Sequence, residues 1–227
     1  MKRIFVACLL LIPAVPASGQ RVSSPYRFLD YAQGAGAYAG YLSTSEGLLN
    51  AGPKSAPTFG VHWGYAISGP VRLTAEAGFT PTTRTVRDTV FSATDSLFRE
   101  IGEADMLLLS VLANVRLDLT GQRTWNGLQP FILTGAGAVM DLSGSDEIEE
   151  PLASTARFDF GTSFAGQIGG GVEWYPNTRF SARVDARSVL WKLDVPEAFQ
   201  LTVAGREFVE SRWEMNVLLA LGFSIHF

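Results

Sequence analysis

Residues 213–227, which read WEMNVLLALGFSIHF, decide the fold. Every second position from Trp213 to Phe227 is apolar, whereas the positions between them are small, polar or charged apart from Leu218. Successive side chains of a β-strand point to opposite faces. The stretch is therefore predicted to be a strand with one apolar face and one mixed face.

The same period of two recurs along the chain. The strands so predicted are residues 31–43, 57–67, 71–80, 105–118, 129–140, 162–175, 179–190 and 213–227. Segments 31–43 and 129–140 are too rich in Gly and Ala for their faces to be assigned. A tilted strand of about twelve residues crosses an apolar band about 25 Å tall. Tight turns near 68–70 and 176–178 contrast with long connections near 44–55, 81–103, 141–157 and 191–211, a contrast typical of a barrel with two unlike rims.

The composition favours membrane strands over membrane helices. Hydrophobic residues make up 47% of the chain and charged residues only 18%, below the roughly 25% typical of soluble domains. After residue 16, the sequence contains no run of the roughly 18 apolar residues that a transmembrane helix requires. Apolar residues are numerous but dispersed, as in membrane strands.

The N-terminus has the pattern of an export signal. Lys2 and Arg3 precede an apolar run over residues 4–15, and Ala17-Ser18-Gly19 supplies small residues for cleavage before Gln20. We expect a signal peptide at 1–19, a periplasmic segment at 20–30 and a barrel at 31–227. The only cysteine, Cys8, would leave with the signal.

The charge argues against nucleic acid as a partner. Without Lys2 and Arg3, 16 basic residues face 22 acidic ones, a net charge of −6. Nucleic-acid binding calls instead for a basic patch.

Interior volume decides which face of the sheet points outward. An eight-stranded barrel has a lumen just wide enough for side chains to fill, and the large aromatic residues of the apolar face could not all fit there. The mixed face fits, and its charges should pair, since unpaired charges in a narrow interior are costly. The predicted interior charge network is Arg72, Glu76, Arg116, Asp118, Glu173, Arg183, Asp185, Arg187 and Glu214.

The predicted fold is all-β: an eight-stranded antiparallel transmembrane up-and-down β-barrel. A soluble periplasmic binding barrel with its apolar face inward is the alternative. Full closure would leave no backbone group unpaired in lipid.

The final residues, LLALGFSIHF, resemble the C-terminal signature of bacterial outer-membrane proteins. QPFILTGAGAVM and SFAGQIGGGVEWYP resemble strands of the OmpA-like/OmpX-like superfamily of small outer-membrane barrels. The resemblance implies location in the outer membrane of a Gram-negative-type bacterium, with outer-membrane lipid and lipopolysaccharide as partners. It also implies that the barrel-assembly machinery recognises Phe223, Ile225 and Phe227.

Few residues suggest chemistry. His62 and His226 fall on the mixed face, and a Ser–His pair could make a lipid A deacylase-like hydrolase; an interior histidine held by polar groups is the preferred interpretation. The carboxylates Asp141, Asp146, Glu147, Glu149 and Glu150 lack the spacing of a calcium loop, so a solvated acidic loop is preferred and no metal is expected. Glycines around residues 166–171 precede no helix, so they do not predict a nucleotide site. No cofactor is expected.

The leading functional hypothesis is a barrel plugged by paired charges, not an enzyme, with a structural or surface-interaction role. The alternatives are a narrow porin-like channel and the lipid A-modifying hydrolase. The sequence names no extracellular ligand.

Overall fold

The structure is a computed structural model that describes residues 24–47, 50–89, 98–144, 147–152, 157–158, 160–194 and 211–227. The predicted signal peptide, residues 1–19, lies outside these ranges. Within them, no helix is long and apolar enough to cross a membrane.

The described residues form eight long strands, two short strands and one 3-10 turn. The long strands are β2 (Gln33–Ser43), β3 (Ala56–Ser68), β4 (Val71–Thr89), β5 (Phe98–Asp118), β7 (Leu128–Asp141), β8 (Thr162–Trp174), β9 (Phe180–Asp194) and β10 (Ser211–His226). The short elements are β1 (Tyr26–Phe28), β6 (Arg123–Trp125) and the 3-10 turn η1 (Glu147–Glu149).

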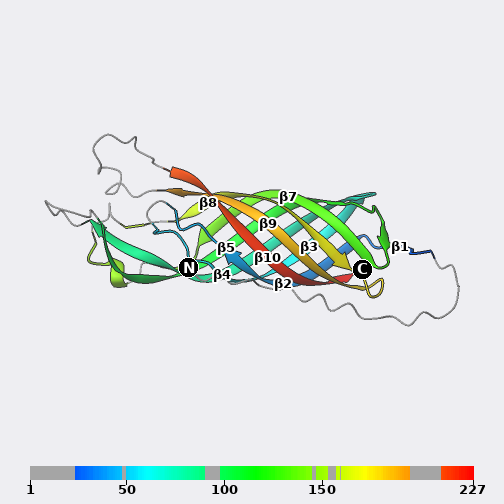
Figure 1. Cartoon of the computed structure of the whole chain (residues 1–227), viewed down its shortest axis with the longest axis horizontal. Coiled ribbons are helices and arrows are strands. Elements are labelled where there is room, and N and C mark those ends of the chain that lie inside the picture. The colour runs from blue at the N-terminus through cyan, green and yellow to red at the C-terminus, as the bar shows by residue number, and fades with distance from the viewer. Residues whose placement is uncertain are drawn as a thin grey trace, which may run out of the picture.

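Each long strand pairs antiparallel with its neighbours in the chain, and the sheet closes where β10 pairs with β2. The result is the predicted eight-stranded barrel (Figure 1). One end carries the tight turns and the C-terminus, and we call it the short-turn end. The opposite end carries the longer connections, and we call it the long-loop end.

The outward parity is the one predicted from the terminal strand. Met215, Leu221 and Phe227 are each more than 60% exposed, whereas Asn216 and Ser224 on the opposite face are buried. The same rule settles β2, where Tyr38 is buried and Tyr41 is exposed. Large apolar side chains therefore cover the outside of the barrel.

Strands β4 and β5 are much longer than predicted. Strand β4 continues to Thr89 and β5 begins at Phe98. Most of the connection expected at 81–103 is therefore a two-stranded extension of the barrel wall. Beyond the membrane neither face has to be apolar, so the alternation of apolar and polar residues stops. The β-branched residues Thr82, Thr83, Thr85 and Val86 still favour strand.

Small residues on the inner face make room for rings. A Cβ on Gly60 would lie 2.4 Å from Cζ of Tyr38 and 2.5 Å from the carbonyl oxygen of Ala77. A Cβ on Gly166, on the outer face of β8, would meet nothing nearer than 3.9 Å. An alanine substitution at Gly60 therefore tests the crowded inner face, and the same substitution at Gly166 is its control.

Gly60→Ala is expected to destabilise the barrel by about 1–3 kcal/mol through overpacking, and Gly166→Ala by no more than about 0.5 kcal/mol. Urea unfolding followed by tryptophan fluorescence measures both. Equal midpoints for the two variants would contradict the tight fit of Tyr38 against Gly60.

Candidate functional site: the filled barrel interior

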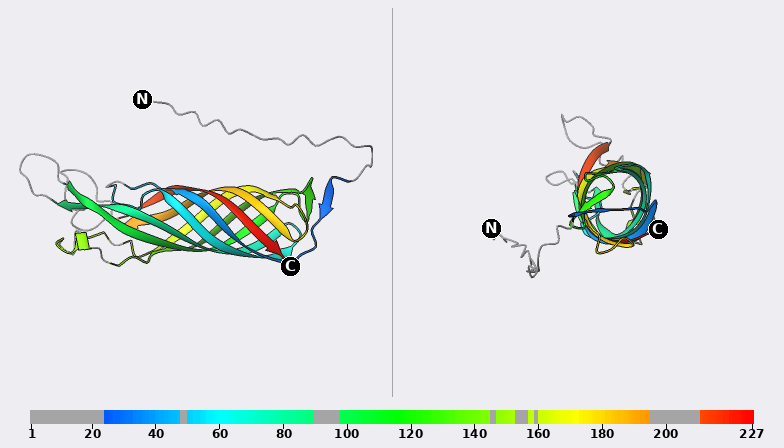
Figure 2. Two further views of the ribbon diagram at one scale, coloured as in Figure 1. Left: turned by 90° about the horizontal axis from the view of Figure 1, so that it is seen from below. Right: turned by 90° about the vertical axis from the view of Figure 1, so that its right-hand side faces the viewer.

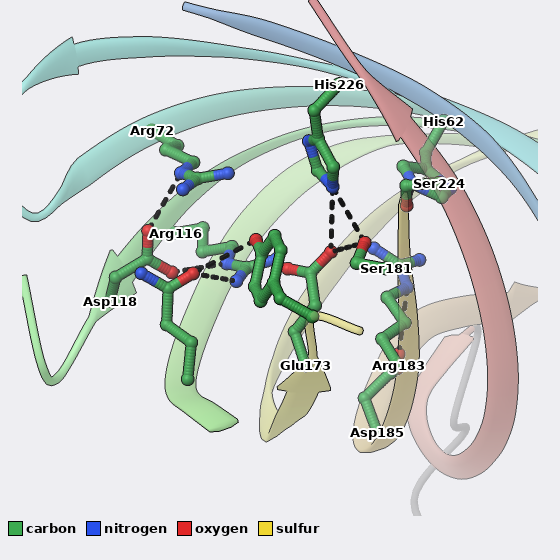
Figure 3. Close-up of polar contacts among 12 residues, drawn as sticks. His62, Arg72, Arg116, Asp118, Glu173, Ser181, Arg183, Asp185, Ser224 and His226 are labelled. Carbon is green, nitrogen blue, oxygen red and sulfur yellow. Dashed lines mark hydrogen bonds and ion pairs between the residues drawn. The ribbon is translucent and has the colours of Figure 1, made fainter. Parts of the chain in front are cut away.

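An ionic cluster occupies the lumen at the short-turn end (Figure 3). Asp118, at the end of β5, accepts from Nε of Arg72 at 2.8 Å and from Nε of Arg116 at 2.7 Å. Arg116 also reaches Oε2 of Glu173 on β8, with Nη1 at 2.5 Å. Two guanidinium groups and two carboxylates thus form one neutral cluster across three strands.

An aromatic layer lies against this cluster. Tyr31, just before β2, accepts a hydrogen bond from Nη2 of Arg72 at 2.7 Å and shares another with the hydroxyl of Tyr175. The His226 ring lies 4.2 Å from the Tyr31 ring and 5.2 Å from the Tyr175 ring, centre to centre. Burial raises the pKa of the Tyr31 hydroxyl to about 12, so it stays a neutral hydrogen-bonding group.

A second ionic cluster fills the middle of the lumen. Glu76 on β4 binds Nη1 of Arg187 and accepts from Nη2 of Arg183 at 3.1 Å. Asp185 lies 2.5 Å from Nε of Arg187 and 3.3 Å from Nε of Arg183. All four groups are almost fully buried, and this cluster is also neutral.

The structure thus brings eight of the nine predicted interior charges into two clusters, and it places Glu214 apart from both. Glu214 is buried at the long-loop end, where it accepts a hydrogen bond from Oγ of Ser45 at 2.6 Å and lies 3.6 Å from Nε of the half-exposed Arg212. Parity predicts the face on which a residue lies but not its height along the barrel, so the separate position of Glu214 does not follow from the sequence pattern.

The long-loop half of the lumen contains a large apolar cluster, which the sequence interpretation did not foresee. Leu108, Leu112, Val139, Trp191 and Leu218 belong to one buried cluster. Within it, the Phe160 ring packs edge-on against Trp191 at 6.2 Å. A cavity of about 30 Å³ remains there, room for about one water molecule. Ionic clusters and apolar side chains therefore occupy both halves of the described lumen.

Two Ser–His pairs lie on the inner face of the barrel (Figure 3). His62 is on β3, Ser181 is on β9, and Ser224 and His226 are on β10. Nε2 of His62 lies 2.9 Å from Oγ of Ser224, and Nε2 of His226 lies 2.7 Å from Oγ of Ser181. Ser181 also binds Glu173. Nδ1 of each histidine has no hydrogen-bond partner among the described residues, whereas a catalytic triad holds that nitrogen with a carboxylate.

Described parts of the connections that follow β2 and β7 pack against β4 and β5 at the long-loop end. Arg84 of β4 forms a buried ion pair with Glu149 of η1, Nη2 to Oε2 at 2.6 Å, and Leu152 packs in a cluster with Val86 and Ala104. Lys54 reaches Glu103 at 2.7 Å, and this pair is largely exposed.

This packing gives the carboxylates of the predicted acidic loop different partners. Glu149 binds Arg84, and Asp141 accepts from the backbone N–H of Ser143 at 2.8 Å; the residue 146 carboxylate lies outside the described ranges. The described part of the chain holds no group of three metal-ligating side chains.

The three residues of the predicted assembly signal lie in sequence on the outer face of the short-turn end. Phe223, Ile225 and Phe227 are about half exposed or more, and the Phe223 ring stacks on Phe180 at 5.7 Å. They form part of the lipid-facing surface.

Sequence comparison places the chain in no family: no family model matches it, and no curated protein does. Solved structures share its fold. The outer membrane protein OprG from Pseudomonas aeruginosa is 15% identical, with a TM-score of 0.51; the match covers 87% of this chain and 97% of that one.

Two further barrels are similar with lower scores. The N-terminal barrel domain of Pseudomonas aeruginosa OprF is 13% identical, with 87% of this chain and 98% of that chain covered and a TM-score of 0.48. Neisserial surface protein A is 16% identical, with 90% and 98% covered and a TM-score of 0.48. The match to OprG shows that the chain has the fold of a small antiparallel β-barrel of the outer-membrane type.

Removing one member of a buried cluster should cost far more than removing one member of an exposed pair. Glu76→Gln leaves Arg183 and Arg187 with one carboxylate, and we expect a loss of about 3–5 kcal/mol of stability. Glu103→Gln weakens the exposed pair with Lys54 and an exposed hydrogen bond from Oγ1 of Thr83, and it should shift the unfolding midpoint far less, because solvent screens such contacts. The measurement is the urea midpoint at neutral pH; a Glu76→Gln midpoint close to that of Glu103→Gln would contradict the role of the central cluster.

Proposed function

We propose that this protein is a plugged barrel of the bacterial outer membrane with a structural or surface-interaction role. The observation that carries the proposal is the filled lumen. Two neutral ionic clusters occupy its short-turn end and its middle, and an apolar core that includes Trp191 and Phe160 occupies its long-loop half. Such an interior anchors the molecule and leaves its rims to make contacts.

The long-loop end supports the surface role. The extension of β4 and β5 is tied to its surroundings by the Arg84–Glu149 ion pair, and Oγ1 of Thr82 donates to the carbonyl of Lys54 at 2.6 Å. A packed projection keeps its shape when it meets a partner and so loses little entropy on binding. In this proposal the long-loop end faces the exterior and the short-turn end faces the periplasm.

The proposed partners follow from this placement. Lipid and lipopolysaccharide would contact the outer apolar surface, and the barrel-assembly machinery would engage the strand that carries Phe223, Ile225 and Phe227. The extracellular ligand is not specified by any residue described above. No cofactor enters the proposal.

A plugged barrel should not conduct. Purified protein in planar bilayers is expected to show no discrete current steps in potassium chloride, because Arg116, Glu173 and Tyr175 obstruct the short-turn half. A variant with Arg116→Ser, Glu173→Ser and Tyr31→Ala, checked for folding by heat-modifiability on a gel, opens only the short-turn mouth. It should also stay closed, because the central cluster around Glu76 remains. Regular steps from the unaltered protein would favour the channel alternative.

The hydrolase alternative has its own test. The Ser224 hydroxyl is buried and His62 lacks a carboxylate partner on Nδ1 among the described residues, so neither side chain is placed as an activated pair at the lipid surface. We expect His62→Ala and Ser224→Ala to leave the acyl chains of lipid A unchanged in mass spectra of cells that express each variant. A change in acylation common to both variants would establish an enzyme.

A further inference from the structure

A small two-stranded sheet extends the barrel wall at the short-turn end (Figure 2). Strand β1 pairs antiparallel with β6. Strand β6 joins β7 through Asn126 and Gly127, both with positive φ, as a two-residue hairpin turn requires. The N–H of Asn126 donates to the carbonyl of Pro25 at 2.8 Å, which ties the two strands at this corner.

The strand register shows which way the small sheet faces. Trp174 of β8 pairs with Leu128 of β7, Leu128 with Trp125 of β6, and Trp125 with Tyr26 of β1. Directly paired residues lie on the same face of a sheet, and Trp174 lies on the lipid-facing surface of the barrel. The outer face of the barrel therefore continues onto β6 and β1.

The two faces of the small sheet carry different side chains. On the inner side, Thr124 is completely buried, and Arg27 is exposed and donates from Nη1 to the carbonyl of Pro176 at 3.4 Å. Tyr26, Phe28 and Trp125, on the outer side, are each 53–55% exposed. Arg123, the register partner of Phe28, is also exposed on that side. Three aromatic side chains and a guanidinium thus share one open surface at the rim.

This chemistry matches the boundary between lipid and water. Tyr and Trp rings have an apolar body and a polar edge and are enriched at membrane interfaces, and arginine binds phosphate through paired N–H groups. This surface is also continuous with the lipid-facing surface of the barrel, because Leu128 of β7 pairs with Trp174 on one side and with Trp125 on the other. We propose that β1 and β6 form an interfacial anchor, which seats Tyr26, Phe28 and Trp125 among the phospholipid headgroups at the short-turn rim.

The anchor would also hold the adjoining chain in place. Leu29, the residue after β1, is buried and donates its N–H to the carbonyl of Gln122 at 2.9 Å. Two residues later, Tyr31 binds Arg72 within the lumen. A lipid-held β1 therefore keeps this aromatic layer seated, and the inference depends on the transmembrane placement of the barrel rather than on its surface role.

The test uses the mature chain, whose only cysteine would be removed with the signal, in phospholipid vesicles of phosphatidylethanolamine and phosphatidylglycerol. Phe28→Cys and Arg27→Cys, neighbours on opposite faces of β1, each receive a nitroxide label. We expect the ratio of oxygen to nickel-chelate collision rates to be several-fold higher at position 28 than at position 27. Equal ratios, or a label at 28 shielded from both reagents by protein, would overturn the anchor.

A second measurement needs no label. Because Trp63, Trp174 and Trp213 also lie on the outer surface, the quantity measured is the fluorescence that the unaltered protein has in excess of Trp125→Phe at equal concentration, and brominated phospholipid should quench this excess. A gel shift on boiling verifies that both chains are folded. If the excess fluorescence is not quenched, Trp125 does not contact lipid and the proposal fails.

Discussion

A strand in hydrocarbon must have every backbone N–H and C=O paired within the protein, because lipid offers no hydrogen-bond partner. The barrel meets this demand because β2 and β10, the first and last long strands, pair with each other. Their register runs from Ser43 with Val217 to Gly34 with His226. Closure at eight strands also sets a narrow lumen. Large apolar side chains must then face lipid, and inward residues must fit one another closely.

The narrow lumen explains how charge is arranged inside. Each ionic cluster combines two arginines with two carboxylates, so neither leaves a net charge away from water. Arg116 and Asp185 each contact two opposite charges. Glycine makes room for the inward side chains. A Cβ on Gly34 would lie 2.6 Å from Nδ1 of His226, so the His226 ring occupies the space that the side chain of any other residue at position 34 would take.

The two ends of the molecule use different forces. At the short-turn end, tyrosine hydroxyls and guanidinium groups satisfy one another around Tyr31 and Arg72. At the long-loop half, Trp191 and the leucines pack without charge, and the Arg84–Glu149 pair fastens the outer connections.

Alternation along 213–227 predicted the strand, because side chains of a strand point alternately to its two faces. The narrow lumen of an eight-stranded barrel then predicted the outward face and the class of barrel, because large apolar side chains do not fit inside it. The pairing of charges also followed, because buried charge is costly whatever the details. Other features did not follow. The length of β4 and β5, the position of Glu214 and the apolar half of the lumen depend on height along tilted strands, which the register decides. The Asn126-Gly127 turn was a readable hairpin signal that the sequence interpretation overlooked. Tyr31 and Tyr175 lie just outside the strands they adjoin and are far apart in the sequence, so only the closed barrel brings their hydroxyl groups together.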